Sequence, residues 1–383
     1  MSQKTFAELT AQVIKDRRYF HQYPELSWQE FETAKFIKKR LSELNIELLD
    51  YPLPHVVGYI NGAKGNQTIA LRADMDALPV QEEGEKPYQS KNPGISHACG
   101  HDGHMAILLG VAQWISENRG KVSPNIVLLF QPSEETEPSG AANLVKKGAL
   151  NGVDAVYGLH LWQGLEKGKI GLAHGPMMAS SDEFEITIEG SGGHGSTPHT
   201  TVDPIYISSH IIQAVQAIVS RNTDPNETKV ISIGSIEAGK TYNIIPDTVT
   251  MKGTVRAFSL ETVGYIEKRI REITEGICNT FHAKGKVEYI KGTPPLINHK
   301  EESERVERAV QKAFGNDVFE EMTPIMGAED FSNYLLYKPG AFTFVGMGGE
   351  KSKYPHHHSR FDIDEKVLPN AMKWMIQLIK DYR

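Results

Sequence analysis

Residues 125–135 read NIVLLFQPSEE, and this stretch carries the strongest indication of the fold. Its apolar part, Asn125–Phe130, lies between two prolines and is typical of a short buried β-strand. Two adjacent carboxylates, Glu134 and Glu135, follow directly. Open α/β sheets bind their ligands beyond the carboxyl ends of the strands. The stretch therefore predicts a buried strand of an α/β sheet with acidic functional groups at its end.

Helix and strand patterns alternate on both sides of this stretch. Strands are predicted at Thr68–Arg72 and Val153–Leu159, and helices at His104–Asn118 and Gly140–Lys147. Short buried strands that alternate with helices are typical of a sheet covered on both faces. Similar patterns predict further helices at Phe6–Phe20, Phe31–Leu44, Glu301–Phe314 and Leu368–Tyr382, and further strands at Val56–Ile60 and Ala341–Gly346. The fold class is therefore expected to be α/β.

A different pattern begins near Ala179. Glu183–Glu189 alternates apolar and polar residues with period two, as a half-exposed strand does. The elements expected after it are helix Ile205–Arg221, strands Lys229–Ile236 and Thr248–Phe258, helix Leu260–Phe281 and strand Lys286–Lys291. The order strand, helix, strand, strand, helix, strand is that of a ferredoxin-like α+β layer. We therefore expect residues 179–294 to be an inserted domain, and residues 1–178 and 295–383 to form the main domain.

Composition excludes several classes of protein. The chain has 383 residues, with 41 basic and 48 acidic side chains and a net charge of −7, which argues against nucleic acid or an anionic membrane as the main partner. Its longest strongly apolar stretch, Ala106–Ile115, is shorter than the roughly 18 residues that a membrane span needs. With two cysteines and no visible signal sequence, the protein is expected to be soluble and cytoplasmic, without a disulfide framework.

Two glycine motifs resemble nucleotide-binding loops. Gly234–Thr241 matches the P-loop pattern, but that loop needs a helix N-terminus after it, and the residues around Pro246 indicate loop and strand instead. Gly190–Gly195 matches G-x-G-x-x-G but has no acidic residue about 20 positions further on. We interpret the first as a turn between two strands and reject the second as a weak, isolated match, so nucleotide binding is the least favoured alternative.

Residues 97–104 read HACGHDGH and combine three imidazoles, a thiol and a carboxylate. The spacing of Cys99 and His101 would place both side chains on one side of an extended segment, which suits a transition-metal site. The alternative is a turn with Asp102 as a cap and a buried cysteine. The density of donor groups favours metal binding.

Further candidate groups follow the other predicted strands. Asp74 and Asp76 come after the strand that ends near Arg72, and His160 follows Val153–Leu159. Each of these alone is more often structural, but together with the Cys/His cluster they indicate one site. Of the two glutamates, one could ligate metal while the other takes a proton from bound water.

Three consecutive histidines near the C-terminus, His356, His357 and His358, are expected to supply at least one further ligand. The resulting mixture of sulfur, imidazole and carboxylate suits zinc, manganese, cobalt or iron. It excludes a calcium-type cage of oxygen atoms alone.

Ten motifs from Arg17 to Glu365 together resemble one family. They are RRYFHQYPELSWQEFETA, LRADMDALP, HACGHDGH, QPSEE, GLH, GSGGHGSTPH, YNIIPD, GTVRAF, GAEDFS and HHHSRFDIDE. In this order they resemble the amidohydrolase branch of the aminoacylase/glutamate-carboxypeptidase metallopeptidases, which includes hippurate hydrolases, auxin-conjugate hydrolases and N-acetyldiaminopimelate deacetylases. The resemblance implies a dinuclear-metal α/β catalytic domain, with a central mixed sheet between helices, and an inserted lid that often makes the dimer.

The resemblance also implies a set of metal ligands. They are Cys99, His101, Glu135, His160 and His357. Cys99 stands where sister branches carry a bridging aspartate, so its thiolate is expected to bridge the two metals or bind one. The family's last ligand stands four residues before the phenylalanine of the final motif, here Phe361, which selects His357. His356 and His358 stay open as alternatives.

Catalytic and substrate-binding roles follow from the same resemblance. Glu134 is expected to be the general base, and Asp76 to support it by orienting a ligand or the metal-bound water. On the lid, His194 is expected to reach across the dimer towards the oxyanion. Asn243 and Arg256 are expected to hold the substrate's carboxylate, because a planar guanidinium suits a carboxylate better than an ammonium does.

The function expected from these features is metal-dependent hydrolysis of N-acyl, above all N-acetyl, amino acids. The expected cofactors are two divalent transition-metal ions, manganese or zinc with cobalt as a further option, and the expected assembly is a homodimer. A dipeptidase or carboxypeptidase of the same fold is the alternative enzyme. A non-catalytic metal-binding protein is the alternative from another class, against which the spare carboxylate of Glu134 argues.

Overall fold

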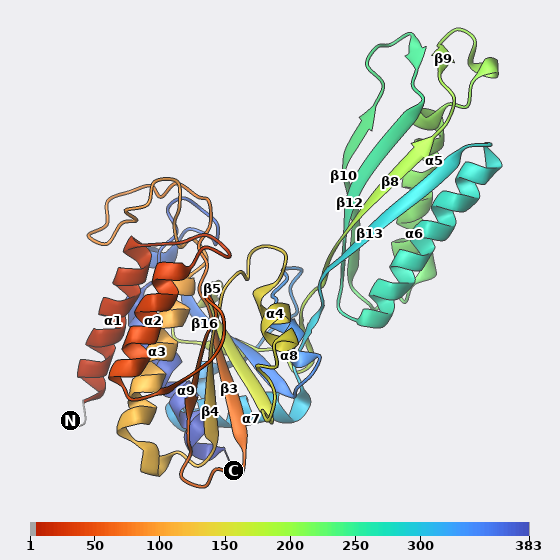
Figure 1. Cartoon of the computed structure of the whole chain (residues 1–383). Helices are drawn as coiled ribbons and strands as arrows, with labels where there is room; N and C mark the ends of the chain where they lie inside the picture. The colour runs from red at the N-terminus through yellow and green to blue at the C-terminus, as the bar shows by residue number, and fades with distance from the viewer. Residues whose placement is uncertain (1–4, 383) are drawn as a thin grey trace. The chain divides into compact units, whose positions relative to one another are not determined.

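The computed structural model describes residues 5–382, which divide into two compact units (Figure 1). Unit 1 contains the described residues up to Gly175, Ile297–Thr323 and the residues from Asp330 onward. Unit 2 contains Pro176–Leu296 and Pro324–Glu329. None of the described helices is long and apolar enough to cross a membrane.

The segment Pro324–Glu329 belongs to unit 2, whereas the sequence-based division placed it in the main domain. Its backbone pairs with the start of unit 2: Ile325 N donates to Met177 O at 3.0 Å, and Ala179 N donates to Gly327 O at 2.9 Å. This pairing joins residues far apart in the sequence, and six residues without periodic apolar positions carry no signal of it.

Unit 1 is built on an eight-stranded mixed sheet of order β1-β2-β4-β3-β5-β16-β6-β15. The strands are β1 (Glu47–Leu49), β2 (Val56–Ile60), β3 (Thr68–Asp74), β4 (Asn125–Gln131), β5 (Ala155–Glu166), β6 (Ile170–Leu172), β15 (Phe319–Glu321) and β16 (Gly340–Gly348). The neighbours β4, β3, β5 and β16 run parallel to one another. Their carboxyl ends therefore meet at one edge of the sheet, where α/β proteins place their sites.

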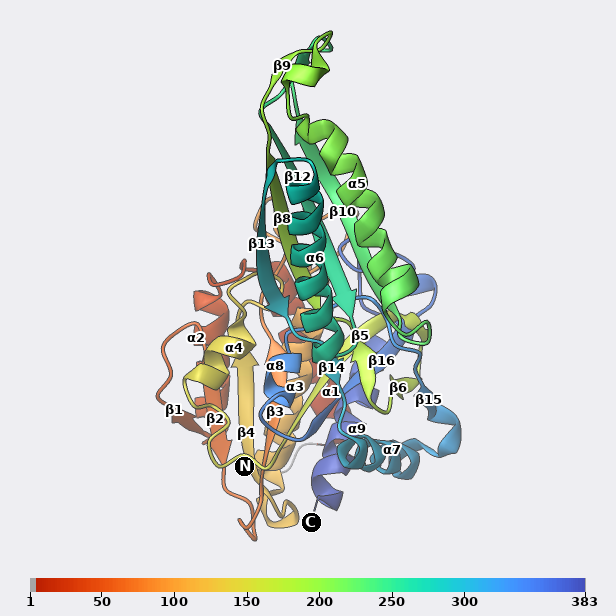
Figure 2. The ribbon, with the colours of Figure 1, turned by 90° about the vertical axis from the view of Figure 1, so that its right-hand side faces the viewer.

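Helices cover both faces of this sheet. They are α1 (Phe6–Gln22), α2 (Phe31–Glu43), α3 (His101–Glu117), α4 (Gly140–Lys146), α7 (Lys300–Phe314), α8 (Ser332–Leu335) and α9 (Leu368–Asp381). Figures 1 and 2 show α1 and α3 on one face and α4 and α8 on the other. Helix α3 is buried along almost its whole length because it packs on the sheet and against α1 and α9. The α/β architecture expected from the sequence is confirmed.

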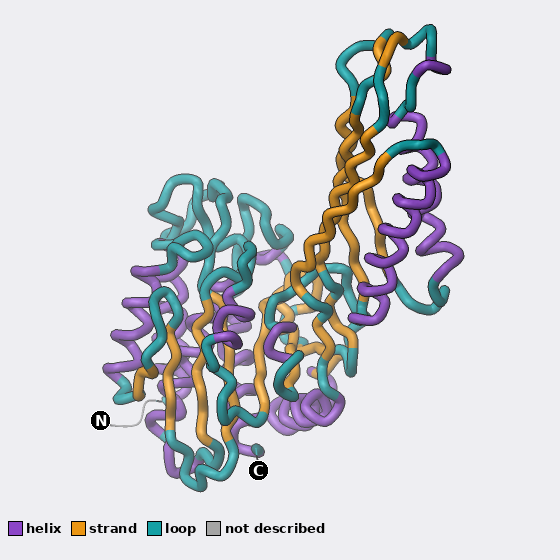
Figure 3. The backbone as a smooth tube through the Cα atoms, turned by 45° about the vertical axis from the view of Figure 1, so that its right-hand side comes forward, coloured by secondary structure: helices purple, strands orange, loops and turns teal. Residues whose placement is uncertain are grey.

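Unit 2 is a four-stranded antiparallel sheet with two helices on one face (Figure 3). The elements are β8 (Ser181–Glu189), α5 (Pro204–Ala217), β10 (Lys229–Ala238), β12 (Thr248–Ala257), α6 (Leu260–Thr280) and β13 (Lys284–Thr293). The sheet order β10-β12-β8-β13 is that of a split β-α-β, ferredoxin-like layer. Alternate residues of β8 face the helices, which explains its period-two pattern.

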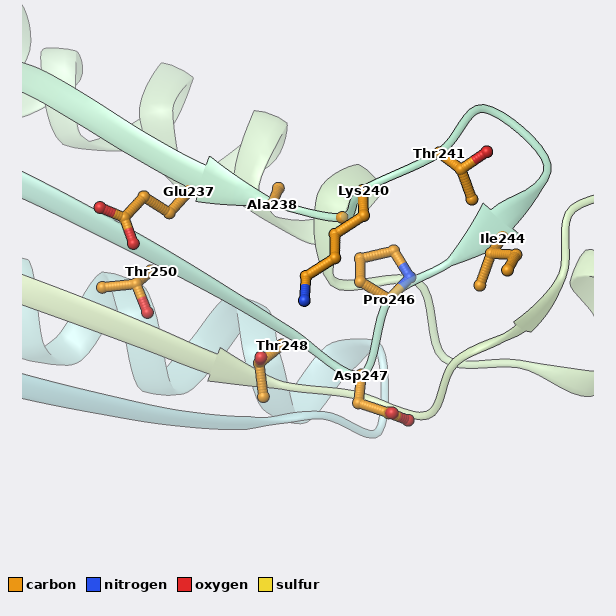
Figure 4. A pocket seen from close by; sticks show the side chains of 10 residues that line it. Glu237, Ala238, Lys240, Thr241, Ile244, Pro246, Asp247, Thr248 and Thr250 are labelled. Atoms are coloured by element: carbon orange, nitrogen blue, oxygen red, sulfur yellow. The ribbon is translucent and has the colours of Figure 1, made fainter.

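The P-loop match lies at the end of β10 and lacks the structure that phosphate binding needs. Gly239 turns the chain at φ +57°, and the next regular element among the described residues is the strand β11 (Ile244–Ile245), not a helix. A cavity of about 560 Å³ beside this turn is lined by two carboxylates, Glu237 and Asp247, and by Lys240 (Figure 4). Without a helix N-terminus, no converging backbone amides offset the two carboxylates there.

Buried polar contacts connect helix α1 to helix α3 and to the loop that contains Glu82. His21 Nδ1 lies 2.7 Å from Asp102 Oδ2, and His21 Nε2 lies 2.9 Å from Glu82 Oε1. Glu82 also accepts the backbone amide of Ser90 at 2.7 Å and lies 2.9 Å from Lys86 Nζ. Burial would raise the pKa of Glu82, but these partners outweigh it and lower the pKa to about 2.

Replacing Glu82 by Gln is expected to lower the free energy of unfolding near neutral pH by about 1–3 kcal/mol. Because the folded-state pKa of Glu82 is depressed from 4.5 to about 2, its stabilisation is present above pH 4.5 and is lost as the pH falls towards 2. Urea unfolding should therefore show a difference in the free energy of unfolding between wild type and variant that disappears as the pH falls from 4.5 to 2. The exposed Glu85, replaced by Gln, is the control, and a difference that persists at the acid end would contradict the assignment.

Candidate metal centre

Donor atoms of five side chains converge in unit 1 and form two overlapping triads. One consists of Cys99, His101 and His160, and the other of Cys99, Glu135 and His357; within each triad the donor atoms lie within 4.8 Å of one another. Cys99 Sγ is 3.4 Å from His160 Nε2, and His357 Nε2 is 3.3 Å from Glu135 Oε1. Cys99 is common to both triads, so its sulfur atom lies within 4.8 Å of the donor atoms of each.

The loop before α3 is not extended, contrary to the expectation from the Cys99/His101 spacing. Gly100 has φ +96°, and α3 begins at His101 instead of at His104. Glycine adopts this left-handed conformation without the steric cost that a Cβ atom brings. The turn at Gly100, and not a strand-like alternation, places Cys99 and His101 in one cluster.

His160 also differs from its expected place, because it lies inside β5 and not after it. The strand continues to Glu166 because β16 pairs with it there, with Phe344 opposite His160. The ring donates from Nδ1 to the Leu161 carbonyl at 2.9 Å, which leaves Nε2 facing Cys99. Burial, helped by neighbouring imidazoles such as His104, lowers the pKa of His160 well below its usual range. A neutral ring with a free Nε2 lone pair is the form that binds metal.

His101 and Glu135 carry buried polar atoms without hydrogen-bond partners. His101 Nε2, Glu135 Oε1 and Asp76 Oδ1 are buried and make no hydrogen bond, although His357 Nε2 lies 3.3 Å from Glu135 Oε1 and His101 Nδ1 lies 3.3 Å from Asp76 Oδ1. Such atoms cost free energy unless an ion or water satisfies them. His101 Nδ1 donates to the Asp76 carbonyl at 2.9 Å, which directs Nε2 into the cluster. These donors fit divalent transition-metal ions.

Electrostatics also favours a cation at this cluster. Burial opposes protonation of His101, but Asp74, Asp76 and Glu135 outweigh burial and raise its pKa to about 10. Burial and the nearby carboxylates raise the pKa of the Cys99 thiol well above its usual range. The site therefore carries excess negative charge, and a Cys99 thiolate would form here only with a cation beside it.

Glu134 and Glu135 lie in the turn that follows β4, and hydrogen bonds to the backbone of this turn fix its shape. Ser133 has φ +52°, and its amide donates to the buried carboxylate of Glu30 at 2.8 Å. Asp76 supports the turn because its carboxylate accepts a hydrogen bond from the Glu135 amide at 3.0 Å. Glu134 is half-buried, and its carboxylate lies in one donor group with the imidazole of His101 and the carboxylate of Glu135.

Asp76 itself is buried beside His101 and stays ionised. Its Oδ2 accepts a hydrogen bond from the Ser27 hydroxyl at 2.7 Å, and Oδ1 is 3.3 Å from His101 Nδ1. Burial would raise its pKa, but His101, the Glu135 amide and Ser27 lower it below the usual value. Asp76 therefore orients His101 and the acidic turn at the same time.

The three consecutive histidines have three different environments. His356 donates from Nε2 to the Leu161 carbonyl at 2.9 Å, and its ring stacks on Trp162. His358 stacks on Tyr354 and accepts the Arg360 amide at 3.0 Å. Only His357 belongs to a donor triad among the described residues.

Buried charged groups behind the cluster support it, and the sequence patterns picked out Asp74 among them but not the pairing of Arg72 with Asp330. His104 Nδ1 lies 2.7 Å from Asp74 Oδ1, and Arg72 Nη1 donates to Asp74 Oδ2 at 2.7 Å. Arg72 Nη2 donates to Asp330 Oδ1 at 2.7 Å. Arg72 was noted only as the end of a strand and Asp330 only as part of a motif, because pairing across 258 residues has no local signal.

The three candidate residues of unit 2 form two groups. His194 belongs to β9 (Gly193–His194), which pairs with β11 next to Asn243, and both side chains are exposed. Arg256 lies near the other end of β12, where Ala257 pairs with Ser180. Strands rise about 3.3 Å per residue, so Arg256 is roughly 25 Å from Thr248, beyond which the β9–β11 pair lies. Unit 2 brings His194 and Asn243 together and separates them from Arg256.

Comparison with known proteins places the chain in a family. Residues 70–381 match the model of peptidase family M20/M25/M40. The chain is 42% identical over 373 residues to N-acetyl-L-cysteine deacetylase of Bacillus subtilis (strain 168), across 97% of this chain and 88% of that protein. It is 40% identical over 367 residues to thermostable carboxypeptidase 1 of Saccharolobus solfataricus, across 94% of this chain and 93% of that protein.

A solved structure is similar over almost the whole length. The YXEP protein of Bacillus subtilis, a dinuclear metal binding peptidase from the M20 family, superimposes with a TM-score of 0.87 at 34% identity, covering 98% of each chain. The family resemblance carried by the sequence motifs is thereby confirmed, and the donor set of unit 1 agrees with a site for two metal ions. The chain therefore belongs to peptidase family M20/M25/M40 and is a hydrolase of amide bonds.

Proposed function

We propose that this protein hydrolyses the amide bond of N-acyl amino acids, above all N-acetyl derivatives, and releases a carboxylate and the free amino acid. The observation that carries the proposal is the pair of donor triads that share Cys99, with the additional carboxylate of Glu134 beside them. The 42% identity to a deacetylase of N-acetyl-L-cysteine supports the choice of acyl group.

Cys99, His101, Glu135, His160 and His357 would hold two divalent transition-metal ions, manganese or zinc, with cobalt as a further option. When bound, such ions polarise the scissile carbonyl and lower the pKa of the attacking water. Hydrogen bonds from Nδ1 of His101 and His160 to backbone carbonyls keep the Nε2 atoms of both rings available for this role.

Glu134 is the proposed general base. Its side chain lies beside the ligand cluster, and a carboxylate in that position removes the proton of the attacking water and then delivers it to the leaving amine. Asp76 is the proposed supporting residue, because it holds both His101 and the Glu135 amide.

The separation within unit 2 supports a homodimer that shares its sites. We assign Arg256 and Asn243 to the substrate's carboxylate and His194 to the oxyanion. One copy of unit 2 cannot present both Arg256 and the His194–Asn243 pair to a substrate of amino-acid size, since they lie at opposite ends of β12. The three residues act together if His194 and Asn243 come from a second copy of the chain.

Mixed dimers test this arrangement. His194→Ala and Arg256→Ala are each expected to inactivate the homodimer, since each removes a substrate contact from both sites. Co-expression with two different tags isolates the mixed dimer, in which one site keeps both residues and the other lacks both. That dimer is expected to recover about half of the wild-type turnover. An inactive mixed dimer would contradict the shared site.

The reaction itself is tested by amine release from a panel of N-acyl amino acids, with chelator-stripped protein and with added manganese or zinc. Metal-dependent release from N-acetyl amino acids is expected. Simple dipeptides with a free α-amine test the second candidate function, a carboxypeptidase or dipeptidase, which the 40% identity to a thermostable carboxypeptidase favours. Cleavage of dipeptides alone would replace the proposed substrate class, and absence of bound metal would contradict the site.

A further inference from the structure

The N-terminal motif RRYFHQYPELSWQEFETA contains a buried cation that the proposed mechanism does not use. Arg17 lies in α1, outside the residues 70–381 that match the family model, and its side chain is fully buried. Burial of a guanidinium is expensive unless carboxylates pair with it and every donor finds an acceptor. The groups that contact Arg17 therefore indicate its role in the protein.

Three carboxylates from distant parts of the sequence surround the guanidinium of Arg17, and the most distant of them, Glu365 Oε1, lies 3.4 Å from Nη1. Arg17 Nε donates to Asp102 Oδ2 at 2.8 Å, and its Nη2 donates to Asp362 Oδ1 at 2.7 Å. The aromatic ring of Tyr88 lies against the guanidinium, 4.7 Å from ring centroid to Cζ, and the Tyr88 hydroxyl donates to Asp362 Oδ2 at 2.9 Å. A planar fork can bind two carboxylates in fixed directions, which an ammonium cannot do.

Asp102 and Asp362 each stand on a segment that carries candidate metal ligands. Asp102 follows His101 directly in the first turn of α3. Asp362 belongs to the C-terminal segment that contains His357, and this segment touches the first one where His357 N donates to the Ala98 carbonyl at 2.8 Å. Arg17 therefore joins the two chain segments that bring Cys99 and His357 into one triad.

We propose that Arg17 is a positioning residue for the metal centre, which holds the segment of Cys99 and His101 and the segment of His357 at the separation that two metal ions need. The proposal rests on the metal site of the proposed function. Arg17 does not touch the donor atoms and acts through Asp102 and Asp362. His21 assists from the same helix, because its Nδ1 lies 2.7 Å from the same Asp102 oxygen.

The test uses holoprotein loaded with Zn²⁺ and follows transfer of zinc to a chromogenic chelator at a temperature well below unfolding. Arg17→Lys keeps the charge but loses the fork, so it is expected to release at least one zinc ion about 10–100-fold faster than wild type. At saturating zinc, kcat and KM are expected to return towards wild-type values. The matched control is Arg18→Lys, since Arg18 is the next residue of α1 and its side chain is 47% exposed.

A second variant keeps the test decisive if Arg17→Lys fails to fold. Asp362→Asn retains an acceptor for Arg17 but removes the charge, and its side chain is already 20% exposed, so the fold should tolerate it. It is also expected to speed zinc release. Folded variants that release zinc at the wild-type rate, with only a lower melting temperature, would show a structural role and overturn the proposal. Wild-type protein that retains no zinc would instead contradict the metal site itself.

Discussion

Replacement of Glu134 by Gln is expected to lower kcat by about 10²–10⁴-fold while the protein keeps its two metal ions. Glutamine has nearly the same shape but cannot accept the proton of the attacking water. The five candidate ligands stay unchanged, so metal content should not fall. Steady-state kinetics on an N-acetyl amino acid and elemental analysis of the same preparation measure both effects.

The matched control for this variant is Glu137→Gln. Glu137 lies in the same turn, but it is exposed, and it accepts the Ser139 amide at 2.9 Å. Its replacement should leave kcat within about twofold of wild type, because no reacting group depends on it. Near-normal turnover of Glu134→Gln would exclude Glu134 as the general base, whereas loss of metal together with activity would make it a ligand.

Replacement of Arg72 by Met is expected to lower the free energy of unfolding by about 3–5 kcal/mol. The guanidinium lies between two carboxylates, Asp74 and Asp330, at 2.7 Å from each, and all three side chains are at most 1% exposed. Methionine fills similar space but removes the cation that the two buried carboxylates share, and only His104 beside Asp74 and neutral donors such as the Ser139 hydroxyl beside Asp330 then face them. Unfolding in guanidinium chloride measures the loss of stability. The protein is metal-free in this experiment, so that metal binding does not contribute.

A surface pair in the same unit provides the comparison. Arg308 pairs with Glu304 at 3.8 Å on α7, with 63% of its side chain exposed, and Arg308→Met should cost less than about 1 kcal/mol. Adding Asp330→Asn to Arg72→Met should recover part of the stability, because it removes one of the uncompensated charges. Equal losses for Arg72→Met and Arg308→Met would contradict the burial argument.

The sequence predicted the central strands well for a local reason. The run Asn125–Phe130 is apolar throughout and lies between prolines, and the structure places β4 at Asn125–Gln131. The three-residue strands β1, β6 and β15 were missed, because a segment that short has no detectable period. Strand β5 was predicted too short, since its second half is held by pairing with β16, whose residues are almost 200 positions away.

The sequence by itself determined the chemistry of this protein: which donor groups are present, that acidic residues follow a buried strand, and which family the motifs indicate. Those features are local, since they depend on residue type and short spacing. Only the tertiary structure decided that Cys99 belongs to two triads and that Arg17 links their segments. These facts depend on contacts between residues far apart in the chain, which packing and burial of charge select and no local pattern records.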